Sequence, residues 1–264
     1  EDTVFRIYSM TKPITSVGLM MMYEQGVFQL DDPVSMYMPE FKDMSVFKGG
    51  NADNFTVTPA EREITIRHLL THTSGLTYGF MQKHPVDEMY RRHDVGGATA
   101  NRTTQSFVKK LSELPLLFSP GDRWSYSVAT DVLGRLIEIL SGQTLDAYFN
   151  HHILTPLGMT ETAFSVADGC QDRFAANYRR SGNSFELIDD PKASTFLAPP
   201  ALLSGGGGLV STAGDYYRFC QMLLNRGELN GVRLLGSKTV DFMRSNHLPN
   251  GGDLTSMGQA VFSE

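Results

Sequence analysis

The chain has little that would tie it to a metal ion, a nucleic acid or a membrane. Its two cysteines are too few for a disulfide scaffold, and its seven histidines form no metal-ligand spacing. The net charge of −6 and the short basic runs argue against a nucleic-acid or anionic-membrane surface. No apolar run is long enough to span a bilayer. We therefore expect no metal, no cofactor, no nucleic-acid partner and no membrane partner.

Two motifs of common enzyme classes are also missing. The chain contains no G-x-S-x-G elbow, which disfavours an α/β-hydrolase triad. The glycine run 205–208 is not followed by the Lys-Ser/Thr pair of a phosphate loop, and we expect it to allow a close backbone approach at a pocket edge. The chain opens with Glu1 and shows no signal peptide, so we expect the natural N-terminus to lie upstream. The sequence does not assign a cellular compartment, although it favours the cytoplasm.

The most informative stretch that is present is Ser9-Met10-Thr11-Lys12. It lies where a strand-like run from Val4 gives way to an apolar helical pattern that ends at Gly26. A serine hydroxyl is a poor nucleophile unless a base or a cation lies close by. On a helix, Lys12 would lie one turn above Ser9 on the same face, and the helix N-terminus would favour an anion there. These are the components of an acyl-transfer site.

The pattern S-x-x-K occurs two more times in the chain, so it is weak evidence by itself. The stretch from Ser45 to Lys48 follows Asp43 and precedes two glycines, and we interpret it as a loop. The stretch from Ser106 to Lys109 lies in a predicted amphipathic surface helix and would be a solvated pair. Only Ser9 has a strand before it and a long apolar helix after it.

The remaining chain reads as helices joined by long polar segments. The pattern predicts helices at 65–72, 103–114, 129–141, 144–154 and 213–226, loops at 48–56, 77–102 and 166–204, and a hairpin turn at Asn230-Gly231. The loop 77–102 would suit a flap over a pocket. Thr212 and Asp215 would form a capping box for the helix that follows them. Cys220 lies in the same helical pattern, and we expect it to be a small core residue.

A second candidate for chemistry is Tyr126, in the stretch Trp124-Ser125-Tyr126-Ser127 just before the predicted helix 129–141. A tyrosine is a useful base only if its pKa, ordinarily near 10, is depressed, and a nearby ammonium group has that effect. Ser9, Lys12 and a tyrosine that faces them would make a complete nucleophile-and-base system. His72 reads as a hydrogen-bonded structural residue, and Tyr148-Phe149-Asn150 as helix packing.

Five short segments occur in an order that resembles one enzyme superfamily. They are Tyr8-Ser9-Met10-Thr11-Lys12-Pro13, the stretch 69–76, Pro120-Gly121 with Trp124-Ser125-Tyr126-Ser127, Pro156-Leu157-Gly158-Met159, and the stretch 206–212. Together they resemble the serine β-lactamase-like superfamily, which includes class C β-lactamases and DD-peptidases. Within it, the stretch 126–135 is most similar to the β-lactamase-like carboxylesterases of family VIII. The resemblance covers nearly the whole chain.

The resemblance implies a role for each matching residue. Ser9 would be the nucleophile, Lys12 its activating ammonium and Tyr126 the partner base, with the Ser9 backbone N–H as half of the oxyanion hole. Lactamases of this group usually carry Tyr-x-Asn, but this chain has Val128 at the Asn position, which favours simple esters. The third family motif, Lys/His/Trp-x-Gly, is expected downstream of residue 264. We therefore expect residues 1–264 alone to have weak activity or none, because half of the oxyanion hole would be missing.

These observations lead to one prediction of fold and function. We expect an α/β (α+β) fold with an antiparallel sheet flanked by helices, incomplete within these residues. Residues 27–205 would be mostly helical and loop, and 1–26 with 206–264 would belong to the α/β region of a single β-lactamase-like domain. The function would be a serine carboxylesterase acting on a small-molecule ester. The alternatives are a β-lactamase or DD-peptidase, or a non-catalytic scaffold of the same fold; the oligomeric state stays unassigned.

Overall fold

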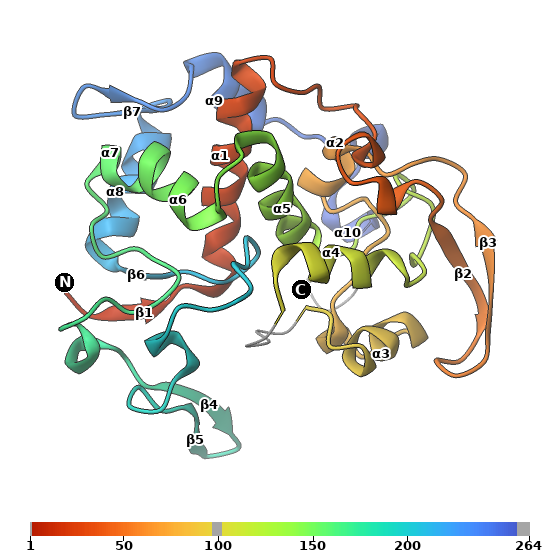
Figure 1. The fold of residues 1–264 in the computed structure, drawn as a ribbon, viewed down its shortest axis with the longest axis horizontal. Helices are drawn as coiled ribbons and strands as arrows, with labels where there is room; N and C mark the ends of the chain where they lie inside the picture. The colour runs from red at the N-terminus through yellow and green to blue at the C-terminus, as the bar shows by residue number, and fades with distance from the viewer. Residues whose placement is uncertain (1, 97–101, 258–264) are drawn as a thin grey trace.

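Helices are the commonest regular structure of the molecule, and the strands form short antiparallel pairs around them (Figure 1). The computed structural model describes residues 2–96 and 102–257. The α-helices are α1 (Thr11–Glu24), α2 (Ile66–Leu70), α3 (Pro85–Arg92), α4 (Thr104–Ser112), α5 (Ala129–Ser141), α6 (Leu145–Phe149), α7 (Thr155–Leu157), α8 (Ala213–Leu224), α9 (Ser237–Met243) and α10 (Leu254–Met257). This mixed α/β architecture with antiparallel pairing confirms the predicted fold class.

The strands pair two by two within the described residues. They are β1 (Val4–Arg6) with β6 (Val210–Thr212), β2 (Ser45–Gly50) with β3 (Phe55–Pro59), β4 (Asn177–Ser181) with β5 (Ser184–Asp189), and β7 (Glu228–Leu229) with β8 (Val232–Arg233). The last pair is joined by the predicted Asn230-Gly231 turn, in which both residues have positive φ. The division into regions 27–205 and 1–26 with 206–264 stays a prediction.

The β1–β6 pair determines where the N-terminal segment lies. Val4 is opposite Thr212 and Arg6 is opposite Val210, and the N–H of Ile7 donates to the carbonyl of Leu209 at 3.0 Å. Because the two strands run antiparallel, the residues that follow β1 lie beside those that precede β6. Figure 1 shows β1 and β6 side by side, and the segment around Ser9 is thereby placed against the glycine run 205–208.

Helix α1 is the central buried helix. It is apolar on most of its circumference, with Ile14, Val17 and Leu19 fully buried, as expected for a helix that neighbours surround. Pro13 falls in its first turn, where the missing N–H has no intrahelical partner to lose. Gly18 allows a close approach, because a Cβ there would lie 3.2 Å from the ring of Tyr148. The hydroxyl of Tyr148 donates to the Gly18 carbonyl at 3.0 Å, which confirms the packing role expected for Tyr148.

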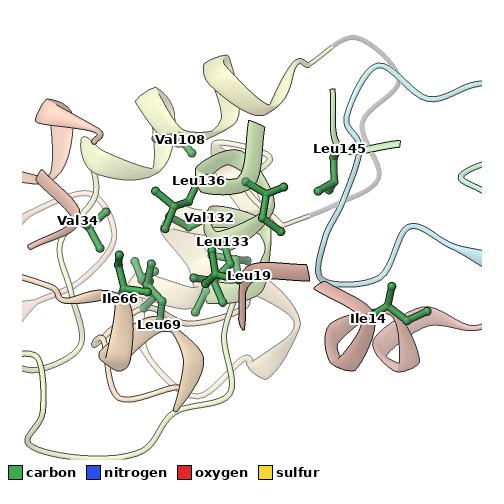
Figure 2. Close-up of a cluster of buried hydrophobic side chains, with 14 of the residues drawn as sticks. Ile14, Leu19, Val34, Ile66, Leu69, Val108, Val132, Leu133, Leu136 and Leu145 are labelled. Atoms are coloured by element: carbon green, nitrogen blue, oxygen red, sulfur yellow. The ribbon is translucent and has the colours of Figure 1, made fainter. Parts of the chain in front are cut away.

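Helix α5 forms the other half of the core. It spans the residues predicted for it, contacts α1, α2, α4 and α6, and ends at Gly142, which takes a left-handed conformation. Figure 2 shows its Val132, Leu133 and Leu136 among side chains from the neighbouring elements, including Leu19, Ile66, Leu69, Val108 and Leu145. This continuous core fixes the start of α1 relative to the start of α5.

Three predicted loops contain regular structure. The stretch Ser45 to Lys48 and the loop 48–56 are a β2–β3 hairpin, whose turn is closed by Asn51 Oδ1 accepting from the N–H groups of Asp53 and Asn54. The loop 77–102 contains helix α3, which His84 caps, while positions 97–101 lie outside the described residues. The loop 166–204 contains the β4–β5 hairpin, which extends away from the helices in Figure 1.

Two smaller predictions about α8 need correction. Cys220 is exposed rather than buried, because α8 covers the core with only one side, where Phe219 and Met222 lie. Thr212 does cap α8 by accepting from the N–H of Asp215, but the reciprocal half of the capping box is absent from the contacts of these residues. The Asp215 carboxylate instead accepts from the Glu161 N–H and the Thr162 hydroxyl, and so ties α8 to the preceding loop.

Candidate active site

Ser9 lies in a single 3-10 turn, Tyr8–Met10, between β1 and α1. The helix proper begins two residues later, at Thr11, so Ser9 precedes its first turn. The side chain of Ser9 is exposed, and the preceding Tyr8 has a φ of 41°. A left-handed φ is unfavourable for a bulky residue and is found mostly where the surrounding structure enforces it, often at functional sites. The turn therefore presents the Ser9 hydroxyl at the surface of a rigid framework.

Lys12 reaches back to Ser9 as the i, i+3 spacing predicts. Its Nζ lies 3.2 Å from Ser9 Oγ and donates to the carbonyl of Gly206 at 2.6 Å. The side chain is only 9% exposed, so its ammonium group is held by protein atoms in a water-poor environment, where charges interact more strongly. The same lysine thus connects the nucleophile to the glycine run.

Tyr126 is the third residue at the nucleophile, and it contacts both Ser9 and Lys12. Its phenol Oη donates to Ser9 Oγ at 2.5 Å, and Lys12 Nζ lies 4.7 Å from the centre of its ring. The loop that carries it is fixed at both ends, since the N–H of Ser125 donates to the His72 carbonyl and that of Val128 to the Thr77 carbonyl. The structure therefore brings together all three residues that the sequence singled out.

Asp131 is a buried acid beside this group that the sequence analysis did not single out. Its Oδ1 accepts from the Ser204 hydroxyl at 2.5 Å and from the Gly206 N–H at 3.0 Å. Burial raises the pKa of Asp131, although the Ser204 hydrogen bond and the positive charge of Lys12 act in the opposite direction. Gly206 thus accepts from Lys12 and donates to Asp131. Only the position of Asp131, five residues after Tyr126 in the first turn of α5, could have drawn attention to it.

The glycine run is required by how closely this segment approaches its neighbours. A Cβ on Gly206 would lie 2.5 Å from Asp131 Oδ2, and one on Gly205 would lie 2.7 Å from the backbone oxygen of Thr130. Both distances are too short for any side chain larger than hydrogen, which agrees with the close backbone approach expected for this run.

His72 lies against Tyr126, with ring centres 5.1 Å apart, and its Nδ1 is 3.1 Å from the Ser127 hydroxyl. Burial, and secondarily the charge of Lys12, lower the pKa of His72 to about 3. The ring is therefore neutral at physiological pH, and the structural role expected for it fits its buried, hydrogen-bonded position. Tyr78 stands on the other side of Tyr126 at 5.2 Å, and burial raises its pKa well above the usual value.

The positions that we set aside are placed apart from this group. Val128 is fully buried beneath the loop and is not a wall of the hollow next to Ser9. Ser45 and Lys48 lie in strand β2, whose register shifts between Phe47 and Gly49, so the pair is not on a helix face as Ser9 and Lys12 are expected to be. Ser106 and Lys109 are exposed on α4, as the amphipathic pattern predicted.

A hollow of about 490 Å³ opens beside the nucleophile. Ser9 and Tyr8 form part of one wall, and Gly206, Gly207 and Gly208 form the part next to them. Its volume falls in the range of about 300–1,000 Å³ that is typical of small-molecule sites. The exposed Ser9 hydroxyl is thus open to a pocket, while the buried Lys12 lies behind it.

Residues 2–96 and 102–257 contain neither a metal-binding cluster nor a helix that could span a membrane. No three His, Cys, Asp or Glu side chains there are arranged to hold a metal ion. None of the helices in this part of the chain has the length and apolar character that a bilayer span requires.

A comparison with families of known proteins identifies the fold. The sequence model of the Beta-lactamase family matches residues 1–261. This chain belongs to the Beta-lactamase family.

Individual members of the family are similar over most of this chain. Esterase EstB of Burkholderia gladioli is 33% identical over 235 residues, which are 83% of this chain and 56% of EstB. The structure of EstCE1, described as a hydrolase with promiscuous acyltransferase activity, has a TM-score of 0.72 and 31% identity over 90% of this chain and 62% of EstCE1. Simvastatin synthase LovD from Aspergillus terreus, unliganded, has a TM-score of 0.76 and 30% identity over 94% of this chain and 59% of LovD.

These similarities establish a family of hydrolases and acyltransferases. The chain spans about 60% of the length of the curated relatives that it matches. The family match and the similar proteins confirm the resemblance to the β-lactamase-like superfamily that the five ordered motifs indicated.

Proposed function

We propose that this protein is a serine hydrolase that cleaves carboxylic esters through an acyl-enzyme at Ser9. The observation that carries the proposal is the position of Ser9 Oγ, 2.5 Å from Tyr126 Oη and 3.2 Å from Lys12 Nζ. A nucleophile within hydrogen-bond reach of a base that is itself oriented by a third group is the arrangement that activates serine. The esterase among the family's members supports the same function.

Acylation would begin with attack of Ser9 Oγ on the ester carbonyl carbon. The mechanism requires Tyr126 to give up its own proton, after which its Oη takes the serine proton. The ammonium group of Lys12, whose Nζ lies 4.7 Å from the centre of the Tyr126 ring, favours the negative charge in that form. The backbone N–H of Ser9 donates to the oxyanion of the tetrahedral intermediate. When the C–O bond to the alcohol breaks, Tyr126 returns the proton to the leaving alkoxide oxygen, and the acyl group remains on Ser9.

Deacylation would reverse these roles with water in place of the alcohol. A water molecule attacks the acyl carbon while its proton passes to Tyr126. The bond to Ser9 Oγ then breaks, Tyr126 protonates Ser9, and the carboxylic acid leaves. Lys12 stays an ammonium group throughout, held by the Gly206 carbonyl, and contributes charge balance rather than a transferred proton.

Esters fit the site better than β-lactams or peptides do. The amide side chain that would hold a substrate's acylamino group is replaced by Val128, which is buried and cannot donate a hydrogen bond. Among the described residues that line the hollow, none is Lys, Arg or His, so a substrate carboxylate finds no positive partner in these walls. A neutral ester needs neither group.

Rates of two substrates separate the esterase from the amide hydrolase. The full-length protein should hydrolyse p-nitrophenyl butyrate with a kcat/KM that exceeds its value for a chromogenic cephalosporin. Faster turnover of the cephalosporin would overturn the ester preference. Measurement of the two reactions in a Ser9→Ala variant, with Ser106→Ala as the matched control, shows whether both depend on Ser9.

Acyl transfer to an alcohol is a second candidate, because EstCE1 is described as having both activities. The same acyl-enzyme would form, and an alcohol would take the place of water. Addition of methanol or n-butanol during ester hydrolysis distinguishes the outcomes: a new ester in the products shows transfer, and carboxylic acid alone shows hydrolysis.

A further inference from the structure

The hollow beside Ser9 is much larger than a small acyl group needs. Its volume is about 490 Å³, and an acetyl group would occupy only a minor part of it. We call it the apolar pocket. Its walls come from parts of the chain that are far apart in sequence, so its shape is set by the fold as a whole.

Aromatic and aliphatic side chains line the pocket away from the nucleophile. Its walls include Phe107, Phe164, Phe196 and Leu202. Of these, Phe107, Phe164 and Leu202 are almost entirely buried. Such a surface gains free energy when an apolar group displaces water from it. It offers little to a polar ligand, which would lose hydrogen bonds to water.

Two of the aromatic walls are held in place by other rings. Phe196 packs edge-on against Tyr8, with ring centres 6.4 Å apart, and Phe80 stacks on Tyr78 at 4.7 Å. Tyr8 directly precedes the nucleophile, so the Phe196 wall has a fixed position relative to Ser9. Pockets pre-formed in this way bind without a large ordering cost.

The charge of the pocket points to an uncharged ligand. Among its described walls the ionisable acid is Asp131, which is 6% exposed and already accepts hydrogen bonds from Ser204 and Gly206. The same walls contain no cationic side chain. A carboxylate or phosphate group on the ligand would therefore meet a buried acid and no opposite charge.

We propose that the apolar pocket binds an uncharged, bulky apolar group of the ester, branched aliphatic or aromatic, and that this group sets the substrate preference. This inference rests on the proposed function of Ser9 and replaces the expected small acyl group with a larger one. Each methylene buried in the pocket should raise kcat/KM by roughly fourfold until the pocket is filled.

Two series of esters test which part of the substrate enters the pocket. The first varies the acyl group of p-nitrophenyl esters from acetyl to octanoyl and includes phenylacetyl. The second varies the alcohol of acetate esters over the same range. We expect kcat/KM of the full-length protein to rise by about tenfold or more along one series. A flat or falling profile in both series would overturn the inference.

A filled-pocket variant ties the preference to this cavity. Ala198 is exposed and lies on the pocket wall, whereas Ala201 is equally exposed in the same segment but does not line the pocket. Ala198→Trp should lower kcat/KM for the bulkiest preferred ester by about tenfold or more while the acetyl ester changes by less than about threefold. The control variant Ala201→Trp should retain the wild-type profile. Equal losses for all esters in Ala198→Trp, or the same profile change in Ala201→Trp, would contradict the proposal.

Labelling by a small fluorophosphonate distinguishes failure of the pocket proposal from failure of the proposed hydrolase function. If Ser9 is labelled but neither ester series shows a preference, the pocket proposal fails and the hydrolase proposal stands. If Ser9 is not labelled, the proposed function fails, and the pocket is tested by binding of neutral octanoate or phenylacetate methyl esters to the Ser9→Ala variant.

Discussion

The phenol Oη of Tyr126 lies 2.5 Å from Oγ of Ser9, although 117 positions separate the two residues. Lys12 accompanies both, with Nζ 3.2 Å from Ser9 Oγ and 4.7 Å from the Tyr126 ring centre. The pairing depends on the packing of α5 against α1, because Tyr126 lies three residues before α5 and Ser9 two residues before α1.

Removal of the Tyr126 hydroxyl should nearly abolish the reactivity of Ser9. In Tyr126→Phe the ring and its packing remain, but the base is lost, so the rate of fluorophosphonate labelling should fall by about 100-fold or more. Tyr216→Phe is a suitable control, because it removes a phenol hydrogen bond to the carbonyl of Met10 without a contact to Ser9. A labelling rate for Tyr126→Phe within about threefold of the wild-type rate would show that Tyr126 is not the base.

Asp131→Asn should separate stability from activity. The pKa of Asp131 is raised in the fold, mainly by burial. At a pH above the carboxyl pKa of the unfolded chain, the Asp131 carboxyl therefore ionises more readily in the unfolded chain than in the folded one. The carboxyl group therefore destabilises the native state increasingly as the pH rises toward its folded pKa, and an asparagine does not.

Urea unfolding of wild type and Asp131→Asn at several pH values checks this sign. We expect the stability of the variant relative to wild type to increase as the pH rises above the ordinary carboxyl pKa toward the raised folded pKa, and to level off beyond it. Above the folded pKa of Asp131 the esterase rate of the variant should fall below that of wild type, because there the ammonium of Lys12 loses a nearby negative charge while Ser204 and Gly206 keep an acceptor. A relative stability that decreases with rising pH would contradict the assignment.

Neighbouring glycines should respond differently to alanine. In Gly206→Ala the new Cβ would lie 2.5 Å from Asp131 Oδ2, so the glycine run and the Asp131 carboxyl must move apart, which disturbs the Gly206 carbonyl that holds Lys12. We expect a loss of about 1–3 kcal/mol in the free energy of unfolding, accompanied by a loss of esterase activity. In Gly207→Ala the nearest atom is the Tyr8 carbonyl carbon at 3.6 Å, an ordinary contact, so the unfolding free energy should stay near the wild-type value. Comparable destabilisation of both variants would contradict this account of the run.

His72 should make the protein sensitive to mild acid. Its pKa is about 3 in the fold, whereas an unfolded histidine has a pKa of about 6.5. Below the unfolded value, the unfolded chain binds a proton that the folded chain does not, so stability falls as the pH decreases from about 6.5 toward 3. At pH 5 this contribution is about 2 kcal/mol lower than at neutral pH.

A variant isolates the contribution of His72 from other titrating groups. Asparagine tolerates the left-handed conformation that His72 adopts, with a φ of 56°, and offers a polar atom to Ser127. Between pH 7 and pH 5, the unfolding free energy of His72→Asn should fall less than that of wild type. Identical pH slopes would show that His72 is not held neutral by the fold.

The sequence carried strong local signals for the centre of the site. The S-x-x-K spacing placed Lys12 beside Ser9, because that relationship depends only on helical geometry. The helix after Tyr126 was predicted over residues 129–141, since its apolar positions repeat with a clear helical period and Gly142 ends it. Tyr126 itself required the resemblance to a family, because nothing local places a loop tyrosine near a serine so distant in sequence.

Contacts that depend on tertiary packing were not visible in the sequence. The Gly206 N–H reaches Asp131 across 75 positions, and Lys12 reaches the Gly206 carbonyl across 194. The two hairpins were mistaken for loops because their outer strands are exposed on both faces: every residue of β3 is exposed, and so are most of β5. Strands with no buried face lack the alternating pattern by which strands are recognised.

Peptide mapping of a fluorophosphonate adduct tests the central claim most directly. The full-length protein is labelled, digested and examined by mass spectrometry, in parallel with the Ser9→Ala and Ser106→Ala variants. The account predicts one adduct, on Ser9, that is absent from Ser9→Ala and retained in Ser106→Ala. An adduct on another residue would contradict an acyl-enzyme at Ser9 and point to a different nucleophile. No adduct in folded wild-type protein would contradict it too, and would favour a scaffold that kept the fold without its chemistry.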